Sequence, residues 1–336
     1  MIPNEPPVTV VTIVYNGDKY LAECIESVLA QTYRNFEYVI VNNCSTDRTL
    51  EIARDYAAKD DRIRVVCNDR HVGVMENYNI GFRTLSSESK YCKMVDADDW
   101  ITPDCLSKMV RVMEAYPTIA IAGAYQLEGD KVQWTGLPPG IERISGKEAC
   151  RISLIDDLSI FGPPTSNLYR SDLVRSHVPF FSVLERHGDI CANYEYLQPY
   201  DFGFVHEPLS VRRVHHGRET TRVEELYMDA VAEVDYASKY GPMYLDKAEQ
   251  DALLKRALDR YHRRLGGAVL KLKGNHFWRY QRSRMKEIGH PISWPNVAGE
   301  AVKEVLREMT NPKTACRKLG QVLREKCSQF GSVYSR

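Results

Sequence analysis

The sequence predicts an α/β protein with a mostly parallel central sheet flanked by helices and a helical extension towards its C-terminal end. Strand and helix patterns alternate four times within roughly the first hundred residues, which is typical of parallel sheets with crossover helices. From Glu224 onward the pattern is helical, with interruptions at Gly and Pro residues.

Four apolar runs in the first part predict strands, namely residues 8–15, 36–41, 63–67 and 91–95. The first run, VTVVTIVY, is nearly continuous, so we expect a strand that is buried on both faces. Helical spacing follows three of these runs, at residues 20–30, 45–56 and 74–85, and Pro103 opens a further helix. The middle of the chain predicts a hairpin-like pair at 119–127 and 132–134 and a strand at 205–214 broken by Pro208.

Composition is that of a soluble globular protein, with 43% hydrophobic and 27% charged residues. The formal net charge is zero, but residues 251–336 contain 19 Lys and Arg against 7 Asp and Glu, so the rest contain 26 against 38. The basic part suits anionic lipid, an anionic polymer or nucleic acid, or it forms solvated helix faces.

The nine cysteines are scattered singly, and no CxxC spacing occurs, which argues against a zinc site and is typical of a reducing cytosol. The N-terminal residues lack the basic and apolar regions of a signal peptide, and no window approaches eighteen apolar residues. We therefore expect a cytoplasmic protein without a transmembrane helix.

Three carboxylates stand within four residues directly after the fourth strand pattern, at Asp96, Asp98 and Asp99. Clustered carboxylates repel one another, and a divalent cation removes that penalty. Mg²⁺ prefers oxygen ligands and often binds one or two carboxylates together with substrate phosphates. The alternative is that Asp98 or Asp99 caps the helix that follows Pro103.

Polar motifs also follow the first two strand patterns, as Tyr15-Asn16 and Asn42-Asn43. Ligands of open α/β sheets bind beyond the carboxyl ends of the strands, so we expect these motifs and the aspartates to form one site. The first strand is followed by no G-x-G-x-x-G, which argues against a dehydrogenase-type dinucleotide site.

Several segments together resemble family 2 glycosyltransferases, which are inverting enzymes with the GT-A fold. The segments are VTIVYNGDKYLAECIESVLAQTYRNFEYVIVNNCSTDRT, HVGVMENYNIGF and MVDADDW. The resemblance covers residues 6–125 and extends more loosely to 220. It implies a catalytic domain at 1–220, with a nucleotide-binding part at 6–125 and an acceptor part at 126–220, and a basic, mainly helical region at 221–336.

The resemblance also implies a role for each motif residue. Tyr15 and Asn16 would line the floor of the nucleotide pocket, and Asn42 would face the base or ribose. Asp96 would contact ribose or the water shell of the metal, Asp98 would bind the metal, and Asp99 would orient donor or acceptor. The family usually has an acidic residue at the position of Asn42 or Asn43, and an amide donates as well as accepts, so the base stays open. A plain turn is the alternative at these two asparagines.

An inverting transfer needs a general base, and the resemblance places it at Asp189, which opens a late helix. Glu185 and Glu195 are weaker candidates, and the alternative for Asp189 is a helix cap. Arg213 and His215 match the family's Arg-x-His segment, so we expect Arg213 at the diphosphate and His215 at the metal. The alternative for this segment is an exposed basic loop.

We therefore expect an enzyme that uses Mg²⁺ or Mn²⁺ and moves a sugar from a nucleotide-diphosphate sugar to a glycan or lipid-linked acceptor. The rival hypothesis is an inactive nucleotide-sugar or glycan-binding module of the same fold, and the Asn42-Asn43 departure is its support. The basic region 221–336 predicts contact with the inner face of a membrane, packing on the catalytic domain or a homo-oligomer interface. We expect no nucleic acid partner.

Overall fold

A computed structural model describes residues 5–134, 136–156, 160–183, 187–214 and 225–310. Chain contacts divide the protein into two compact units, Met1–His216 and Gly217–Arg336. Within the described residues, every strand belongs to the first unit, and the second unit is helical.

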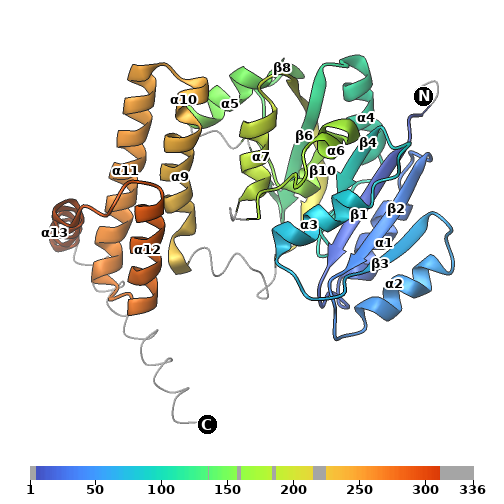
Figure 1. The fold of residues 1–336 in the computed structure, drawn as a ribbon, viewed down its shortest axis with the longest axis horizontal. Helices are drawn as coiled ribbons and strands as arrows, with labels where there is room; N and C mark the ends of the chain where they lie inside the picture. The colour runs from blue at the N-terminus through green and yellow to red at the C-terminus, as the bar shows by residue number, and fades with distance from the viewer. Residues whose placement is uncertain (1–4, 135, 157–159, 184–186, 215–224, 311–336) are drawn as a thin grey trace, which may run out of the picture. The chain divides into compact units, whose positions relative to one another are not determined.

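The first unit is built on a ten-stranded mixed sheet, which confirms the predicted α/β class (Figure 1). The main path through the sheet runs β3-β2-β1-β4-β9-β6-β10-β5, while β7 pairs with β6 and β8 pairs with β10. The strands are β1 (Val8–Val14), β2 (Phe36–Asn42), β3 (Ile63–Cys67), β4 (Tyr91–Met94), β5 (Trp100–Ile101), β6 (Ile119–Glu128), β7 (Lys131–Gln133), β8 (Arg143–Ser145), β9 (Asn167–Arg170) and β10 (Asp201–Arg212).

Strands β3, β2, β1 and β4 are all parallel, as the alternating pattern predicted. Val14 pairs with Asn42, and Asn42 pairs with Cys67, so the carboxyl ends of β1, β2 and β3 meet at one edge. Strand β9 is antiparallel to both β4 and β6, which makes the other half of the sheet mixed. Register shifts in β10 surround Pro208, the residue that was expected to break this strand.

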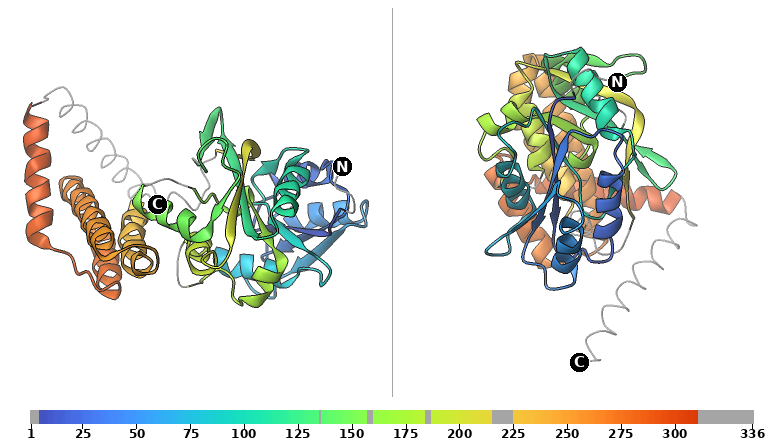
Figure 2. Two further views of the ribbon diagram at one scale, coloured as in Figure 1. Left: turned by 90° about the horizontal axis from the view of Figure 1, so that it is seen from above. Right: turned by 90° about the vertical axis from the view of Figure 1, so that its right-hand side faces the viewer.

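Helices cover both faces of this sheet (Figure 2). They are α1 (Leu21–Leu29), α2 (Thr49–Ala57), α3 (Val74–Arg83), α4 (Cys105–Ala115), α5 (Gly146–Ile155), α6 (Ser171–Ser176) and α7 (Gly188–Tyr196), with a 3₁₀ turn η1 (Pro164–Ser166). Successive side chains of a strand point to opposite faces, and every residue of β1 is buried. Val10 and Val14 pack in the core cluster with α1 and α4, whereas Val11 lies beside Gly81 of α3. The expected strand with two buried faces is confirmed.

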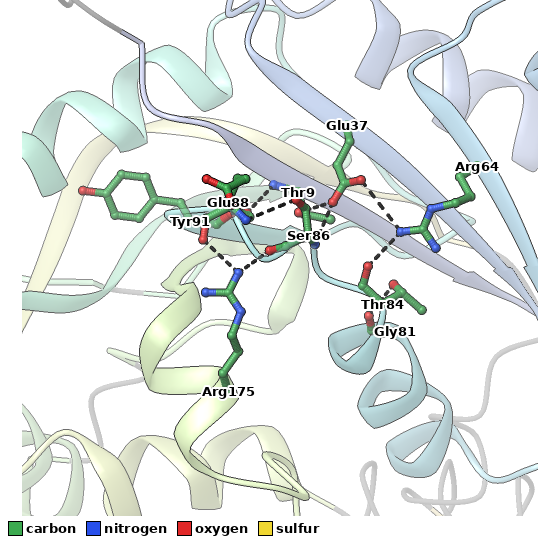
Figure 3. A network of polar contacts seen from close by, with 10 residues as sticks. Thr9, Glu37, Arg64, Gly81, Thr84, Ser86, Glu88, Tyr91 and Arg175 are labelled. Atoms are coloured by element: carbon green, nitrogen blue, oxygen red, sulfur yellow. Dashed lines mark hydrogen bonds and ion pairs between the residues drawn. The ribbon is translucent and has the colours of Figure 1, made fainter.

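A polar network fixes the connection between α3 and β4, the strand that leads to the aspartates (Figure 3). Glu37 of β2 accepts hydrogen bonds from the Thr9 hydroxyl at 2.6 Å and from the Ser86 N–H at 2.9 Å. The Arg175 guanidinium of α6 donates to the carbonyls of Ser86 and Ser89. Because β2 and α6 both hold this connection, they fix where β4 begins.

The second unit contains α9 (Met228–Lys239), α10 (Gly241–Tyr244), α11 (Lys247–Leu270), α12 (Asn275–Glu287) and α13 (Trp294–Thr310). A capping box between Asp246 and Glu249 begins α11. Inside the unit, the Tyr261 hydroxyl donates to Gln281, whose amide donates to the Leu226 carbonyl. In the part of the chain that the structure describes, none of the helices has the length and apolarity that a membrane span requires.

Candidate active site

The aspartate turn lies directly beyond β4, beside the first strand of the sheet. The Val95 N–H donates to the Val11 carbonyl at 2.9 Å, so strand pairing continues up to the first aspartate. The Asp99 N–H then donates to the Asp96 carbonyl at 2.9 Å and closes the turn. Helix α4 begins after Asp104, without a side-chain cap, so neither Asp98 nor Asp99 caps it.

Asp96 is held from two sides, and one of the two groups, Tyr78, is a residue that sequence reasoning missed. The Tyr78 hydroxyl of α3 donates to its carboxylate, and the Thr165 hydroxyl of η1 accepts its backbone N–H at 3.0 Å. The pKa of Asp96 is raised to about 6, chiefly by burial and also by the charges of Asp98 and Asp189, while the hydrogen bonds of Tyr78 and Thr165 oppose the rise. These three carboxylates therefore share one electrostatic environment.

Asp99 is buried and is held by the protein itself. Its two carboxylate oxygens accept from the Gln126 side chain of β6 and from the Arg213 N–H that follows β10, both at 3.3 Å. The Arg213 guanidinium lies 4.7 Å from the ring centres of both Tyr20 and Trp100. It also donates to the Asp98 carbonyl at 3.3 Å and pairs with Glu23. Arg213 and Asp99 thus join the end of β10 to the aspartate turn.

Tyr15 and Asn16 lie at the end of β1, at the same edge of the sheet. Tyr15 is 50% exposed and meets the His71 ring edge-on at 4.3 Å. Asn16 has a left-handed backbone, with φ of 48°, and its side-chain oxygen accepts the Thr46 N–H at 2.8 Å. The loops after β1 and β2 are therefore tied together beside an exposed aromatic pair.

Asn42 and Asn43 are both buried and have different roles in this edge. The Asn42 side-chain oxygen accepts the Ser45 N–H at 3.3 Å. Asn43 bonds the backbone of Val72 twice, accepting its N–H at 3.0 Å and donating to its carbonyl at 2.9 Å. Asn68 donates to the same Asn43 oxygen at 2.9 Å. The side-chain amide of Asn43 thus fixes the loop after β3, whereas an asparagine in a plain turn would have no such contact with a distant loop.

Asp189 lies in the first turn of α7, one residue after the helix begins at Gly188. It does not cap the helix, because the cap position is His187 and no side-chain cap bond forms there. Burial raises the pKa of Asp189, while the His187 charge and backbone N–H groups oppose the rise. The charge of Asp189 raises the pKa of both Tyr78 and Asp96, which shows that Asp189 lies near these two residues.

Two expected residues, His215 and the weaker base candidate Glu185, lie outside the described residues. In the described ranges, no group of three or more His, Cys, Asp or Glu side chains is arranged as a metal site by itself. Asp96 and Asp98 are half-buried and Asp99 is buried, at the edge of the sheet where β1 and β2 also end.

This geometry matches a sheet-edge ligand site, and the sequence pattern of glycosyl transferase family 2 matches residues 9–177, half of the chain. This chain belongs to glycosyl transferase family 2. Both the expected family and the expected fold are therefore confirmed. The match includes the aspartate turn, Tyr78 and η1, and it ends before Asp189 and Arg213.

Relatives with curated descriptions each match little more than a third of the chain. An uncharacterized glycosyltransferase of Haemophilus influenzae is 35% identical over 122 residues, which cover 36% of this chain and 37% of the relative. Glycosyltransferase GlyA of Streptococcus pneumoniae is 34% identical over 118 residues, which cover 35% of this chain and 16% of the relative. The matched part is therefore well under half of each relative.

Solved structures of the GT-A type resemble the fold over a longer stretch. TarS 1–349 of S. aureus, in complex with UDP-GlcNAc, has a TM-score of 0.58 at 20% identity and covers 76% of this chain and 72% of its own. The mannosyltransferase PcManGT of Pyrobaculum calidifontis, in complex with GDP-Man and Mn²⁺, has a TM-score of 0.54 at 16% identity, covering 95% and 85%. At these identities the likeness concerns the fold.

Proposed function

We propose that this chain is an inverting glycosyltransferase that takes a sugar from a nucleoside-diphosphate sugar and transfers it to a hydroxyl of a glycan or lipid-linked acceptor. The observation that carries the proposal is the convergence of Asp96, Asp98 and Asp189 near the carboxyl edge of the sheet. The charges of Asp98 and Asp189 both raise the pKa of Asp96, so carboxylates from two distant segments share one site. Perturbed carboxylates in such a position are candidates for catalysis.

A divalent cation fits the donor set of this site. The aspartates offer only oxygen ligands, and their mutual repulsion is the kind of penalty that bound Mg²⁺ or Mn²⁺ relieves. We propose Asp98 as the protein ligand, with Asp96 at the water shell or ribose and His215 as a second ligand. When bound, the metal supplies positive charge to the leaving diphosphate.

The donor is proposed to lie along the ends of β1 and β2. Tyr15 offers an exposed ring, and Asn16 and Asn42 border the same edge. We propose that Arg213 adds positive charge near the diphosphate. The Asp99 carboxylate keeps Arg213 in place by accepting the backbone N–H of Arg213. TarS with UDP-GlcNAc and PcManGT with GDP-Man and Mn²⁺ are proteins of this fold that bind such donors.

Asp189 is proposed as the general base. In the transfer, it accepts the proton of the acceptor hydroxyl while that oxygen bonds to the anomeric carbon, and the bond from this carbon to the diphosphate oxygen breaks. Attack from the side opposite the diphosphate inverts the anomeric configuration. A pKa raised by burial suits a base that must hold a proton transiently.

The basic second unit is proposed as a contact surface for an anionic membrane or polymer. Residues 271–286 contain six Lys or Arg and no Asp or Glu. Near an anionic membrane, each such residue contributes about 1 kcal/mol. Sedimentation with anionic and neutral vesicles measures this contact, and equal binding to both would contradict it.

A panel assay tests the enzymatic proposal, using UDP-, GDP- and dTDP-sugars with Mn²⁺. We expect Asp189→Asn to lower kcat by roughly 10²- to 10⁴-fold with little change in donor KM, because only proton transfer is lost. Glu195→Gln, on the same helix, is the control, and we expect it to stay near wild type. Proton NMR of the first product reports the anomeric configuration.

A retained configuration would contradict the proposed inversion. Donor binding without hydrolysis or transfer by the wild type would instead favour an inactive binding module.

A further inference from the structure

Lys93 lies in the middle of β4, three residues before the first aspartate, and its side chain is fully buried, with 0% exposure. Lysine is almost never fully buried unless polar partners hold its amine. An apolar residue would pack in a buried strand without that requirement. The buried Lys93 amine therefore needs polar partners inside the protein.

The Lys93 amine binds a segment 72 to 74 residues further along the chain. It donates to the Asn167 carbonyl at 3.1 Å and to the Thr165 carbonyl. Thr165 lies in the turn η1, and Asn167 is the first residue of β9, which pairs antiparallel with β4. One side chain thus joins the aspartate strand to the turn beside it.

Thr165 passes this restraint to the site. Its backbone carbonyl accepts from Lys93, and its hydroxyl accepts the Asp96 N–H at 3.0 Å. Thr165 is itself fully buried. Lys93, Thr165 and Asp96 therefore form a closed path that runs along β4, across to η1 and back to the first aspartate.

The turn is compact and has little room to shift by itself. A Cβ on Gly162 would lie 2.0 Å from the Ser166 hydroxyl oxygen, so a side chain there would force Ser166 to move. The Asn167 amide donates to the Gly162 carbonyl at 2.9 Å and closes the loop. With its shape fixed internally, the turn depends on outside contacts such as Lys93 for its place beside Asp96.

The hydrogen bonds of the Lys93 amine do not depend on its charge. Burial lowers the pKa of Lys93, and the nearby Cys105, Asp96 and Asp99 raise it. Both the charged and the neutral amine carry hydrogens that can be donated to the two carbonyls. The restraint on η1 therefore holds in either protonation state.

We propose that Lys93 is a positioning residue, whose buried amine fixes η1 against Asp96 and so sets the geometry of the aspartate site for transfer. The inference rests on the proposed glycosyl transfer. It concerns turnover, because the donor-side residues Tyr15, Asn16 and Asn42 lie in other loops. The Asp96 carboxylate, which is also proposed on the donor side, keeps its hydrogen bond from Tyr78 when η1 shifts.

The test replaces Lys93 with Met, which keeps the length and removes the donor, and compares it with Lys90→Met. Lys90 lies just before the same strand, is exposed and pairs with Glu114, so it controls for the substitution itself. We expect Lys93→Met to lower kcat for transfer by roughly 10- to 100-fold, because a small displacement of reacting groups is costly. The Kd for UDP or GDP with Mn²⁺, whichever the wild type binds, should change by no more than about 3-fold.

A role in stability alone would lower the Tm of Lys93→Met and leave kcat per folded molecule unchanged, and that result would overturn the inference. If Lys93→Met does not fold, Thr165→Val decides the matter, because it removes only the hydroxyl that holds Asp96. Thr165→Val should lose turnover at native donor affinity, and Thr165→Ser should retain a larger fraction. Unchanged turnover in Thr165→Val overturns the inference.

Failure of the underlying activity is recognised separately. In that case the wild type would neither transfer nor hydrolyse any donor of the panel, whereas failure of this inference leaves the wild type active.

Discussion

At the scale of single residues, the nucleotide edge depends on amide groups that a carboxylate cannot replace. Asn43 donates to the Val72 carbonyl and accepts the Val72 N–H, so it uses both ends of its amide. Asn42 uses only its oxygen, which accepts from Ser45. Position 43 thus requires both a donor and an acceptor, whereas position 42 requires only an acceptor.

This difference predicts that replacement by aspartate destabilises the protein at position 43 and much less at position 42. Asn43→Asp removes the donor and places a carboxylate against the Val72 carbonyl, so we expect unfolding free energy to fall by about 1–3 kcal/mol. Asn42→Asp keeps its acceptor and should change stability much less. Urea unfolding of both variants measures this, and equal losses would contradict the assigned roles.

The raised pKa of Asp96 predicts a pH dependence of stability without metal. Its folded pKa of about 6 lies above the ordinary value of 3.8, so the folded state binds the proton more tightly than the unfolded state. Stability from this group is complete below about pH 4 and is lost as pH rises through about 6. We expect the Tm of the metal-free protein to fall across this window, and Asp96→Asn to reduce the fall.

Mn²⁺ competes with that proton, so its stabilising effect should grow as pH rises through about 6. Thermal unfolding at pH 5 and pH 7.5, with and without Mn²⁺, measures both effects. A Tm increment from Mn²⁺ that is larger at pH 5 would count against the assignment.

The sequence predicted which residues gather at this edge, but it did not predict what holds them. Asp96, Asp98 and Asp99 were found because three carboxylates after a buried strand are unusual. Tyr78 and Thr165 carry no such signal, since an aromatic on a helix face and a threonine in a loop are common. Their contact with Asp96 depends on tertiary packing over 18 and 69 residues of chain.

At the scale of elements, the close approach of α3 to β1 positions Tyr78 next to the aspartate turn. Gly81 permits this approach, because an added Cβ would lie 2.8 Å from a Val11 methyl and 3.2 Å from the Met94 methyl. The helix therefore lies nearer to the sheet than a residue with a side chain allows.

We predict that Gly81→Ala lowers the unfolding free energy by roughly 1–3 kcal/mol, because it overpacks the α3–β1 contact. Gly267→Ala is the matched control, since Gly267 also lies in a helix and an added Cβ meets nothing within 4 Å. That control should be neutral or stabilising by up to about 1 kcal/mol. Denaturant unfolding compares the stabilities of the two variants. No loss of stability in Gly81→Ala would show that α3 and β1 have space for the added methyl group.

Long or continuous elements were predictable, whereas short ones were not. The β-branched run of β1 and the helical spacing of α1 identify themselves from sequence. Strand β9 has four residues after a Pro-rich turn and shows no alternation to recognise. Its antiparallel insertion between β4 and β6 brings η1 to Asp96, so the missed element also supplies the missed contact.

At the scale of the whole molecule, the described residues of the proposed site all belong to the first unit, from Tyr15 to Arg213. The expected division at residue 220 and the separate role of the basic region stay predictions. Sequence predicted the charge asymmetry and the helices of the second unit. It could not predict a partner for this unit, because basic helices suit a membrane, a polymer or another subunit equally.

The central claim is that Asp98 binds a divalent cation that couples a nucleoside diphosphate to this chain. Isothermal titration with UDP, GDP and dTDP, in the presence of Mn²⁺ or of chelator, measures it most directly. Asp104→Ala, beyond the aspartate turn at the start of α4, is the control.

We predict that the wild type and Asp104→Ala bind at least one of these nucleotides only with Mn²⁺, and that Asp98→Ala weakens this binding by at least roughly 100-fold. Equal Mn²⁺-dependent binding by Asp98→Ala, or no binding of any of the three by folded wild type, would contradict the account.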